Sequence, residues 1–353
     1  MLALTAAILG AIMTQSSSQF KLVEANEWNF VSVQMSDLSV IESGGRKQMF
    51  VTIGGHSISE LIPSWTGKAQ NGSSLTFFVR PETEGAGEFS LGTWSEGVAT
   101  PGSRSSVNDQ EDDFSKVITD TLILKKPVDR ITVRIEATPA PDGTMPELKD
   151  LSFVLTSADP KGTPNGMALW NTLLDVPQRA QSNYEGGGVL CSPTSVSMIL
   201  AYWSKKLNKP ELDNDVPIVQ ACVYDPGWNG TGNWPFNVAF AGSQPGMTGY
   251  VTRFRSIQDI EAFVGFGVPI ATSVSYGLLK GVGKQDNDGH LVVVVGFDKD
   301  GDPIFNDPGR NIVRLTYKRA DFEKAWGNSN NTVYVIHPRG WKIPKNGPWP
   351  EQK

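Results

Sequence analysis

Cys191 stands at the start of a segment that predicts a helix, and this position suits a reactive thiol. Residues 186–203 read GGGVLCSPTSVSMILAYW, with apolar residues at helical spacing in the second half. We expect Ser192 to cap the helix and Pro193 to occupy its first position. Unpaired amides and the positive end of the helix dipole stabilise a thiolate there, and the thiolate is the nucleophilic form. The preceding glycines, which include Gly188, let a substrate approach closely.

A cysteine nucleophile needs a base, and the segment GHLVVVVGFDKDGDPIFND supplies one together with a carboxylate. His290 opens an apolar strand, and the turn sequence DKDGD predicts a hairpin centred near Asp300. Folding the chain back at this turn brings Asp307 within side-chain reach of the imidazole. We therefore predict that Asp307 orients His290, and that His290 takes the thiol proton of Cys191 or pairs with the thiolate. The alternatives are a structural histidine and a buried structural cysteine.

Acyl transfer also needs hydrogen-bond donors for the oxyanion of the transition state. The backbone amide of Cys191 and a side-chain amide upstream of it would provide them. The stretch DVPQRAQSNY offers Gln178 and Gln181, either of which could instead lie on the surface. The residues alone therefore leave two candidates for this role.

Metal chemistry finds little support in the sequence. The three histidines are far apart, and none belongs to a zinc-binding motif. The turn around Asp300 resembles the start of a calcium loop, but Pro303 stands where the loop requires glycine and no glutamate closes it. Two cysteines are too few for a disulfide framework, and Cys222 is expected to be structural. We expect no metal and no cofactor.

Length and composition limit the class of protein. A chain of 353 residues with 39% hydrophobic and 19% charged residues predicts a folded protein of two domains. A net charge of −6 argues against nucleic-acid binding. The apolar run from Leu2 to Met13 is too short to span a membrane and fits the core of a leader. We expect an exported protein, in the periplasm, at the cell surface or outside the cell, with no membrane span.

The hydrophobic pattern changes once along the chain. Residues 19–157 alternate polar and apolar positions between turn-rich stretches, which predicts an all-β sandwich of jelly-roll type. After it the pattern indicates helices and then strands, as in an α+β domain. The predicted boundaries are a leader (1–18), the sandwich (19–157), a linker (158–168), the α+β domain (169–340) and a tail (341–353). In the sandwich, Trp65 and Trp94 either form a platform for a carbohydrate or cell-surface ligand, or belong to the core.

The second half resembles a known family. The stretches VPQRAQSNYEGGG, CSPTSVSMILAYW, GNWPFNVAFAG, GHLVVVVGF and IFNDP follow one another as in the bacteriocin-processing type of bacterial cysteine peptidase, cysteine peptidase family thirty-nine of the papain-like clan. The resemblance implies a papain-like fold with Cys191 as nucleophile, His290 as base and Asp307 as orienting group. It favours Gln181 over Gln178 for the oxyanion hole.

The resemblance also implies a substrate and a cleft. The substrate would be a peptide or protein. The stretch GNWPFNVAFAG would form a loop beside the active site, with Asn233 and Trp234 shaping the cleft together with Gly188. Leu190 and Ser192 depart from the family, which often has an aromatic residue before the cysteine and glycine after it. Two alternatives stay open: a cell-wall amidase or transferase that uses the same triad, and a surface-binding protein whose second domain has lost its activity.

Overall fold

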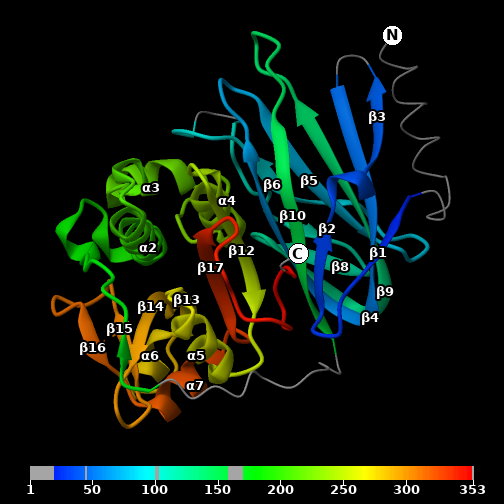
Figure 1. The fold of residues 1–353 in the computed structure, drawn as a ribbon. Coiled ribbons are helices and arrows are strands. Elements are labelled where there is room, and N and C mark those ends of the chain that lie inside the picture. Colours follow the sequence, from blue (N-terminus) through cyan, green and yellow to red (C-terminus); the bar gives the residue numbers. More distant parts are fainter. Residues whose placement is uncertain (1–19, 44–45, 100–102, 158–169, 352–353) are drawn as a thin grey trace.

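The structure of the chain is a computed structural model, and it describes residues 20–43, 46–99, 103–157 and 170–351. It contains a ten-stranded sheet in the N-terminal half and a seven-stranded sheet in the C-terminal half. Figure 1 shows the two sheets in separate regions, with the helices α2–α7 gathered in the second. The prediction of a β-rich region followed by a mixed α/β region is confirmed. The predicted leader and the linker 158–168 lie outside the described residues.

The first sheet has the strand order β2-β10-β4-β9-β5-β6, with β1 and β3 paired to β4, and β8 pairing with both β7 and β9. All of its pairs are antiparallel except β1 with β4. Its strands are β1 (Leu22–Glu24), β2 (Phe30–Val33), β3 (Ser39–Ser43), β4 (Arg46–Lys68), β5 (Ser74–Pro81), β6 (Phe89–Trp94), β7 (Gln110–Glu111), β8 (Ser115–Ile118), β9 (Thr121–Thr138) and β10 (Glu147–Ser157).

The long strands β4 and β9 cross the whole sheet, and the bend in β4 divides the sheet into two halves. The register of β4 on β9 shifts between Gly54 and Ile58 and again before Glu60, and such irregularities bend a strand. Before the shifts β4 pairs with β3 and with the end of β9; after them it pairs with β10 and with the start of β9. Trp65, beyond the bend, stacks on Phe77 of β5 with ring centroids 3.9 Å apart. The two halves therefore share one core.

The second sheet has the order β12-β17-β13-β14-β15-β16, with β11 paired to β14. Its strands are β11 (Thr172–Leu173), β12 (Met247–Arg253), β13 (Ile270–Ser275), β14 (Gly289–Phe297), β15 (Pro303–Asn306), β16 (Arg314–Thr316) and β17 (Thr332–Pro338). The helices are α2 (Cys191–Leu207), α3 (Val216–Val223), α4 (Trp234–Ser243), α5 (Ile257–Gly265), α6 (Tyr276–Leu279) and α7 (Arg319–Gly327). Figure 1 shows α2, α3 and α4 together at one end of this region, with β14 to β16 and α5 to α7 at the other.

The two regions form a continuous core at α4. Phe236 of this helix lies against the rings of Trp65 and Trp94, with centroid distances of 6.2 and 5.6 Å. Both tryptophans are at most 1% exposed. The alternative of a ligand platform at these rings is therefore wrong, because a phenylalanine of the same chain covers them.

A buried arginine also joins the two regions. Arg104, which is 0% exposed, donates to the carbonyls of Ser95 and Gly97 in the first region and of Ala221 and Tyr224 in the second. These four acceptors satisfy a charge that would otherwise be costly to bury. The N-terminal region thereby holds the end of α3 and the loop that follows it.

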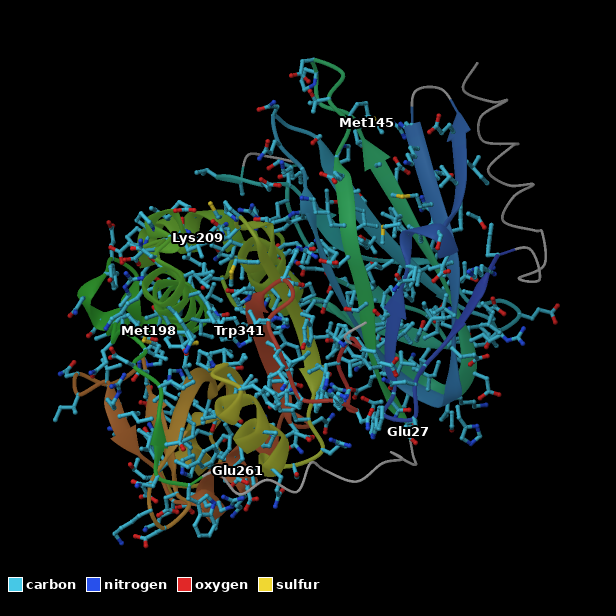
Figure 2. All side chains as sticks on the ribbon, viewed as in Figure 1. Glu27, Met145, Met198, Lys209, Glu261 and Trp341 are labelled. Carbon is cyan, nitrogen blue, oxygen red and sulfur yellow. The ribbon has the colours of Figure 1, made fainter. Side chains whose placement is uncertain are left out.

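The segment after β17 packs onto the second region rather than extending as a free tail. Trp349 is 2% exposed and lies against the rings of Phe254 and Phe263. Trp341, labelled in Figure 2, lies edge-on to Trp203 of α2 at 4.9 Å. Among the described residues, every helix is too short or too polar to cross a membrane.

Candidate active site

Helix α2 begins two residues earlier than the local sequence indicates. Leu190 is the N-cap, Cys191 is the first helical residue and Pro193 is the third, so the prediction that Ser192 caps the helix is wrong. Ser192 is buried and its hydroxyl pairs with the hydroxyl of Tyr334 at 3.0 Å. The missing amide of Pro193 costs nothing in the first turn. Cys191 therefore sits inside the first turn, where its own amide has no partner within the helix.

The hairpin at Asp300 brings His290 and Asp307 together. The amide of Asp298 donates to the carbonyl of Asp302 at the turn, and β14 pairs with β15. The imidazole Nε2 of His290 lies 2.8 Å from Asp307 Oδ1, and both side chains are buried. The predicted contact is confirmed. With Nε2 bound to the carboxylate, Nδ1 is the ring nitrogen left to face the thiol.

The thiol and the imidazole shift each other's pKa in the direction that favours an ion pair. Burial raises the pKa of the half-buried Cys191 thiol, but the hydrogen bond and charge of His290 and the amides of Leu291 and Ser192 outweigh it, and the net pKa is lowered. Burial lowers the pKa of His290, whereas Asp307 and Cys191 raise it to about 9. A thiolate beside an imidazolium is therefore the favoured state between these two pKa values.

The carboxylate of Asp307 is held from three sides. Its Oδ1 accepts from the amide of Gly309 at 2.9 Å as well as from His290, and its Oδ2 accepts from the hydroxyl of Tyr317 at 2.6 Å. Burial raises the pKa of Asp307, but His290, Tyr317 and the amide of Gly309 lower it below its usual range. The group is ionised and fixed in direction, as an orienting carboxylate must be.

Tyr276 covers the imidazole from one face. Its ring lies 4.1 Å from the ring of His290, tilted by 32°. Burial and the charge of Asp307 raise the pKa of Tyr276 to about 12, so its hydroxyl stays neutral. The ring shields the hydrogen bond between His290 and Asp307 from water on that side. Sequence reasoning missed both Tyr276 and Tyr317.

Gln181 and Gln178 have different surroundings. The side-chain oxygen of Gln178 accepts a hydrogen bond from the backbone amide of Arg314, the first residue of β16. Gln178 therefore holds the start of this strand. Gln181 is the first residue of the short helix η3 (Gln181–Asn183). Its backbone amide donates to the carbonyl of Pro308, next to Asp307. A Cβ at Gly187 would lie 2.4 Å from the carbonyl oxygen of Gln181, so only glycine allows this close approach. Gln181 therefore lies beside the segment that leads to Cys191.

The three residues predicted to shape a cleft differ in exposure. Asn233 is 0% exposed; its side chain caps α4 through the amide of Phe236 and donates to Asp225. Its observed task is structural, and burial leaves it no surface for a substrate. Trp234 is half-buried and lines a cavity, and a Cβ at Gly188 would meet nothing within 4 Å. Trp234 and the open backbone at Gly188 are thus placed where a substrate could reach them.

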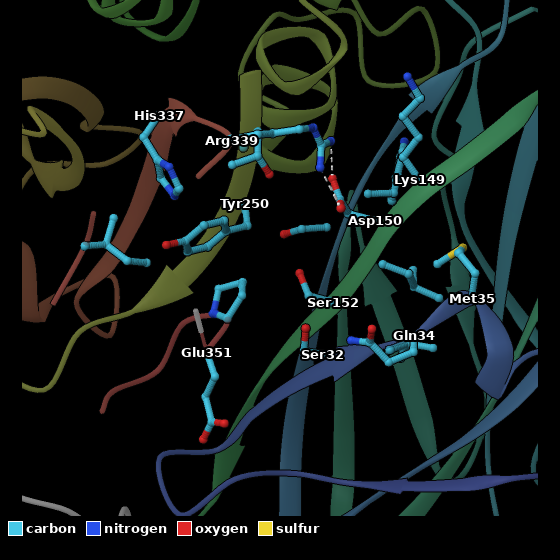
Figure 3. Close-up of a pocket in the computed structure, with 18 of the residues that line it drawn as sticks. Ser32, Gln34, Met35, Lys149, Asp150, Ser152, Tyr250, His337, Arg339 and Glu351 are labelled. Carbon is cyan, nitrogen blue, oxygen red and sulfur yellow. Dashed lines mark hydrogen bonds and ion pairs between the residues drawn. The ribbon is translucent and has the colours of Figure 1, made fainter. Parts of the chain in front are cut away.

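Two cavities lie where the regions meet. One, of about 350 Å³, is lined by Trp234 among other residues and is described further below. A larger one, of about 690 Å³, lies between β2, β10 and β12, and none of the three residues Cys191, His290 and Asp307 lines either cavity. Figure 3 shows that Arg339 and Asp150 form an ion pair across its upper side, above Ser152.

The second cysteine is unlike the first. Both cysteines are free thiols. Burial raises the pKa of the Cys222 thiol, and the nearby Arg104 only partly offsets this. Cys222 is therefore the less reactive thiol at neutral pH. Within the described parts of the chain, no three histidine, cysteine or acidic side chains gather as metal ligands.

Comparisons with known proteins match both halves of the chain. Residues 173–334 match the model of the Peptidase C39 like family, and residues 47–156 match that of the Peptidase C39 N-terminal domain. The comparison with curated proteins finds no match.

Similar solved structures include a candidate C39-like peptidase from Bacillus anthracis, at 17% identity and a TM-score of 0.33. The alignment covers 48% of this chain and 98% of that one. An uncharacterised protein from Burkholderia cenocepacia aligns at 12% identity and a TM-score of 0.19, over 71% of this chain and 59% of that one. On the two family models, residues 173–334 belong to the Peptidase C39 like family and follow a Peptidase C39 N-terminal domain in the same chain.

Proposed function

We propose that the protein is a cysteine peptidase in which Cys191, His290 and Asp307 form the catalytic triad. The observation that carries this proposal is the pairing of His290 with Asp307 at 2.8 Å beside a thiol at the start of a helix, with mutually favourable pKa shifts. Family membership supports it, because a peptidase acts on peptides or proteins. A thiolate is a strong nucleophile at neutral pH, and the imidazolium beside it is a ready acid.

The proposed reaction has two halves. The Cys191 thiolate attacks the carbonyl carbon of the scissile bond, and the carbonyl oxygen becomes an oxyanion that accepts from the Cys191 amide and the Gln181 side chain. The C–N bond then breaks, and His290 gives its proton to the leaving amine, so a thioester remains on Cys191. In the second half His290 takes a proton from water, hydroxide attacks the thioester, and the acid product leaves with the thiolate restored. Asp307 keeps the imidazole oriented throughout.

The finer features of the fold belong to the same proposal. The bent, continuous sheet of the N-terminal region, with Trp65 stacked on Phe77 across its core, supports a sandwich. A helix that carries the thiol and a strand that carries the imidazole, as α2 and β14 do, support a papain-like arrangement. We further propose that residues 1–18 direct export, which the N-terminal sequence of the protein secreted by a producing cell would test.

Peptide hydrolysis by matched cysteine variants tests the function. The protein is incubated with a mixture of casein-derived peptides and, separately, with peptidoglycan fragments, and products are identified by mass spectrometry. We expect new peptide termini from the wild type and from Cys222→Ala, and none from Cys191→Ala. Full hydrolysis by Cys191→Ala would refute the proposal. Cleavage of peptidoglycan fragments alone would replace the peptidase by a cell-wall amidase.

A further inference from the structure

The cavity of about 350 Å³ lies at the junction of the two domains. The N-terminal domain contributes the turn between β8 and β9, and the second domain contributes the loop before α4 and the turn before β17. The residues that line it are Glu60, Ile118, Thr119, Asp120, Thr121, Ile123, Trp228, Gly232, Trp234, Arg253, Ser329 and Asn330. Residues of both domains are therefore needed to form this cavity.

Two chains of contacts connect this cavity to Cys191. On one side, the hydroxyl of Thr231, next to the lining residue Gly232, donates to the carbonyl of Val189, two residues before Cys191. On the other side, the lining residue Ser329 donates to the carbonyl of Ser273.

Ser273 lies opposite Leu291 in the sheet, and the amide of Leu291 donates to the Cys191 sulfur. Tyr334 is hydrogen-bonded to Ser192, and burial together with the charges of Asp120 and Cys191 raises the pKa of its hydroxyl. Cys191 itself does not line the cavity, but these contacts connect the lining residues to the residues that surround the thiol.

The charged groups that line the cavity are already paired. Glu60 and Arg253 form an ion pair at 2.6 Å. Asp120 is 6% exposed; its Oδ2 accepts from the amide of Trp234 at 2.7 Å and its Oδ1 from the hydroxyl of Thr121 at 2.9 Å. A charged side chain that entered would lose water without gaining a free partner from these groups.

The apolar part of the lining is exposed and available. Ile118 is 52% exposed and Trp228 is 47% exposed, and Trp234 and Ile123 are half-buried. The ring of Trp228 lies over Gly230 and Gly232, where a Cβ would come within 2.6 and 3.0 Å of it. The loop is thus shaped to hold this ring flat. Exposed aromatic and aliphatic groups around a small cavity favour an apolar occupant.

We propose that this cavity is a substrate subsite that takes a large apolar side chain next to the scissile bond, and that the N-terminal domain thereby completes the peptidase cleft. The proposal rests on the proposed peptidase function. The turn that carries Ile118 and Asp120 belongs to the Peptidase C39 N-terminal domain, so this domain determines specificity as well as supporting the fold.

A cleavage profile of point variants tests the subsite. A mixture of random octapeptides is digested by the wild type, Ile118→Asp and Trp228→Ala, and preferences on both sides of each cut are read by mass spectrometry. Ile218→Asp is the matched control, because Ile218 is 51% exposed on α3 and does not line the cavity. We expect a preference for large apolar residues at one position, reduced about tenfold in the two subsite variants and kept in the control.

Alkylation of Cys191 by iodoacetamide separates the possible failures. A small reagent reaches the thiol without the subsite, so it reports whether the triad is intact in each variant. Normal alkylation together with an unchanged cleavage profile in Ile118→Asp and Trp228→Ala would overturn the subsite but leave the peptidase. A wild type that is alkylated slowly at Cys191 and cleaves no peptide would overturn the peptidase, and the subsite with it.

Discussion

Replacing Asp307 by asparagine should lower the pH at which activity is lost on the alkaline side. The side chain keeps its size but loses its charge, and His290 loses a charge-assisted hydrogen bond of 2.8 Å. Such a bond contributes about 1.5–3 kcal/mol. Because about 1.4 kcal/mol corresponds to one pKa unit, the pKa of His290 should fall from about 9 by roughly one to two units.

The direction of this shift follows from the ion pair between Cys191 and His290. The pair requires a protonated His290, so activity falls as the pH rises through the pKa of the imidazole, near 9 in the wild type. The assay is kcat/KM against pH, with the rate of Cys191 alkylation measured in parallel. Asp300→Asn is the control, because Asp300 lies on the exposed turn and pairs with its neighbour Lys299. An alkaline limb that stays near 9 in Asp307→Asn would refute the role given to this carboxylate.

Three further predictions concern the oxyanion, the domain junction and acid stability. Gln181→Ala should lower kcat about a hundredfold or more with little change in KM, because an oxyanion donor acts only in the transition state; an unchanged kcat in steady-state assays would contradict this. Arg104→Met should destabilise the protein by at least about 2 kcal/mol in urea, since four carbonyls lose their donor, whereas the exposed Arg46→Met should not. Burial lowers the pKa of His337 from 6.5 to about 4, so protonation of His337 favours the unfolded chain. The free energy of unfolding should therefore fall by up to about 3 kcal/mol as the pH drops from 6.5 to 4, and the fall should be smaller in His337→Gln.

The sequence was most informative where local rules agree with the fold. The helix after Cys191 and the hairpin between His290 and Asp307 follow from periodicity and turn chemistry, and both are present. The start of the helix was misplaced because a tertiary contact decides it: Ser192, a good cap by type, is instead held by Tyr334 from another strand. Local propensity cannot anticipate such a contact.

Other features required knowledge of how distant segments meet. Ser275 and Gly289 are opposite each other in the sheet, which places Tyr276 beside His290. The sequence pattern indicates both strands, but the contact follows only once it is known that these two strands pair. Helix α4 was missed because it is buried on nearly every side and shows no amphipathic period, although Asn233 and the proline after Trp234 mark its start. The contact of Phe236 with Trp65 depends on the placement of two domains, which neither domain's sequence contains.

The relative reactivity of the two cysteines in one molecule tests the central claim most directly. The native protein is treated with iodoacetamide at about pH 6.5, well below the ordinary thiol pKa of about 8.5, and both sites are followed by peptide mass spectrometry. Cys222, whose pKa burial raises, is an internal reference. We predict rapid modification of Cys191 and little of Cys222, with the difference narrowing as the pH rises. Equal rates, or faster modification of Cys222, would contradict a thiolate at Cys191.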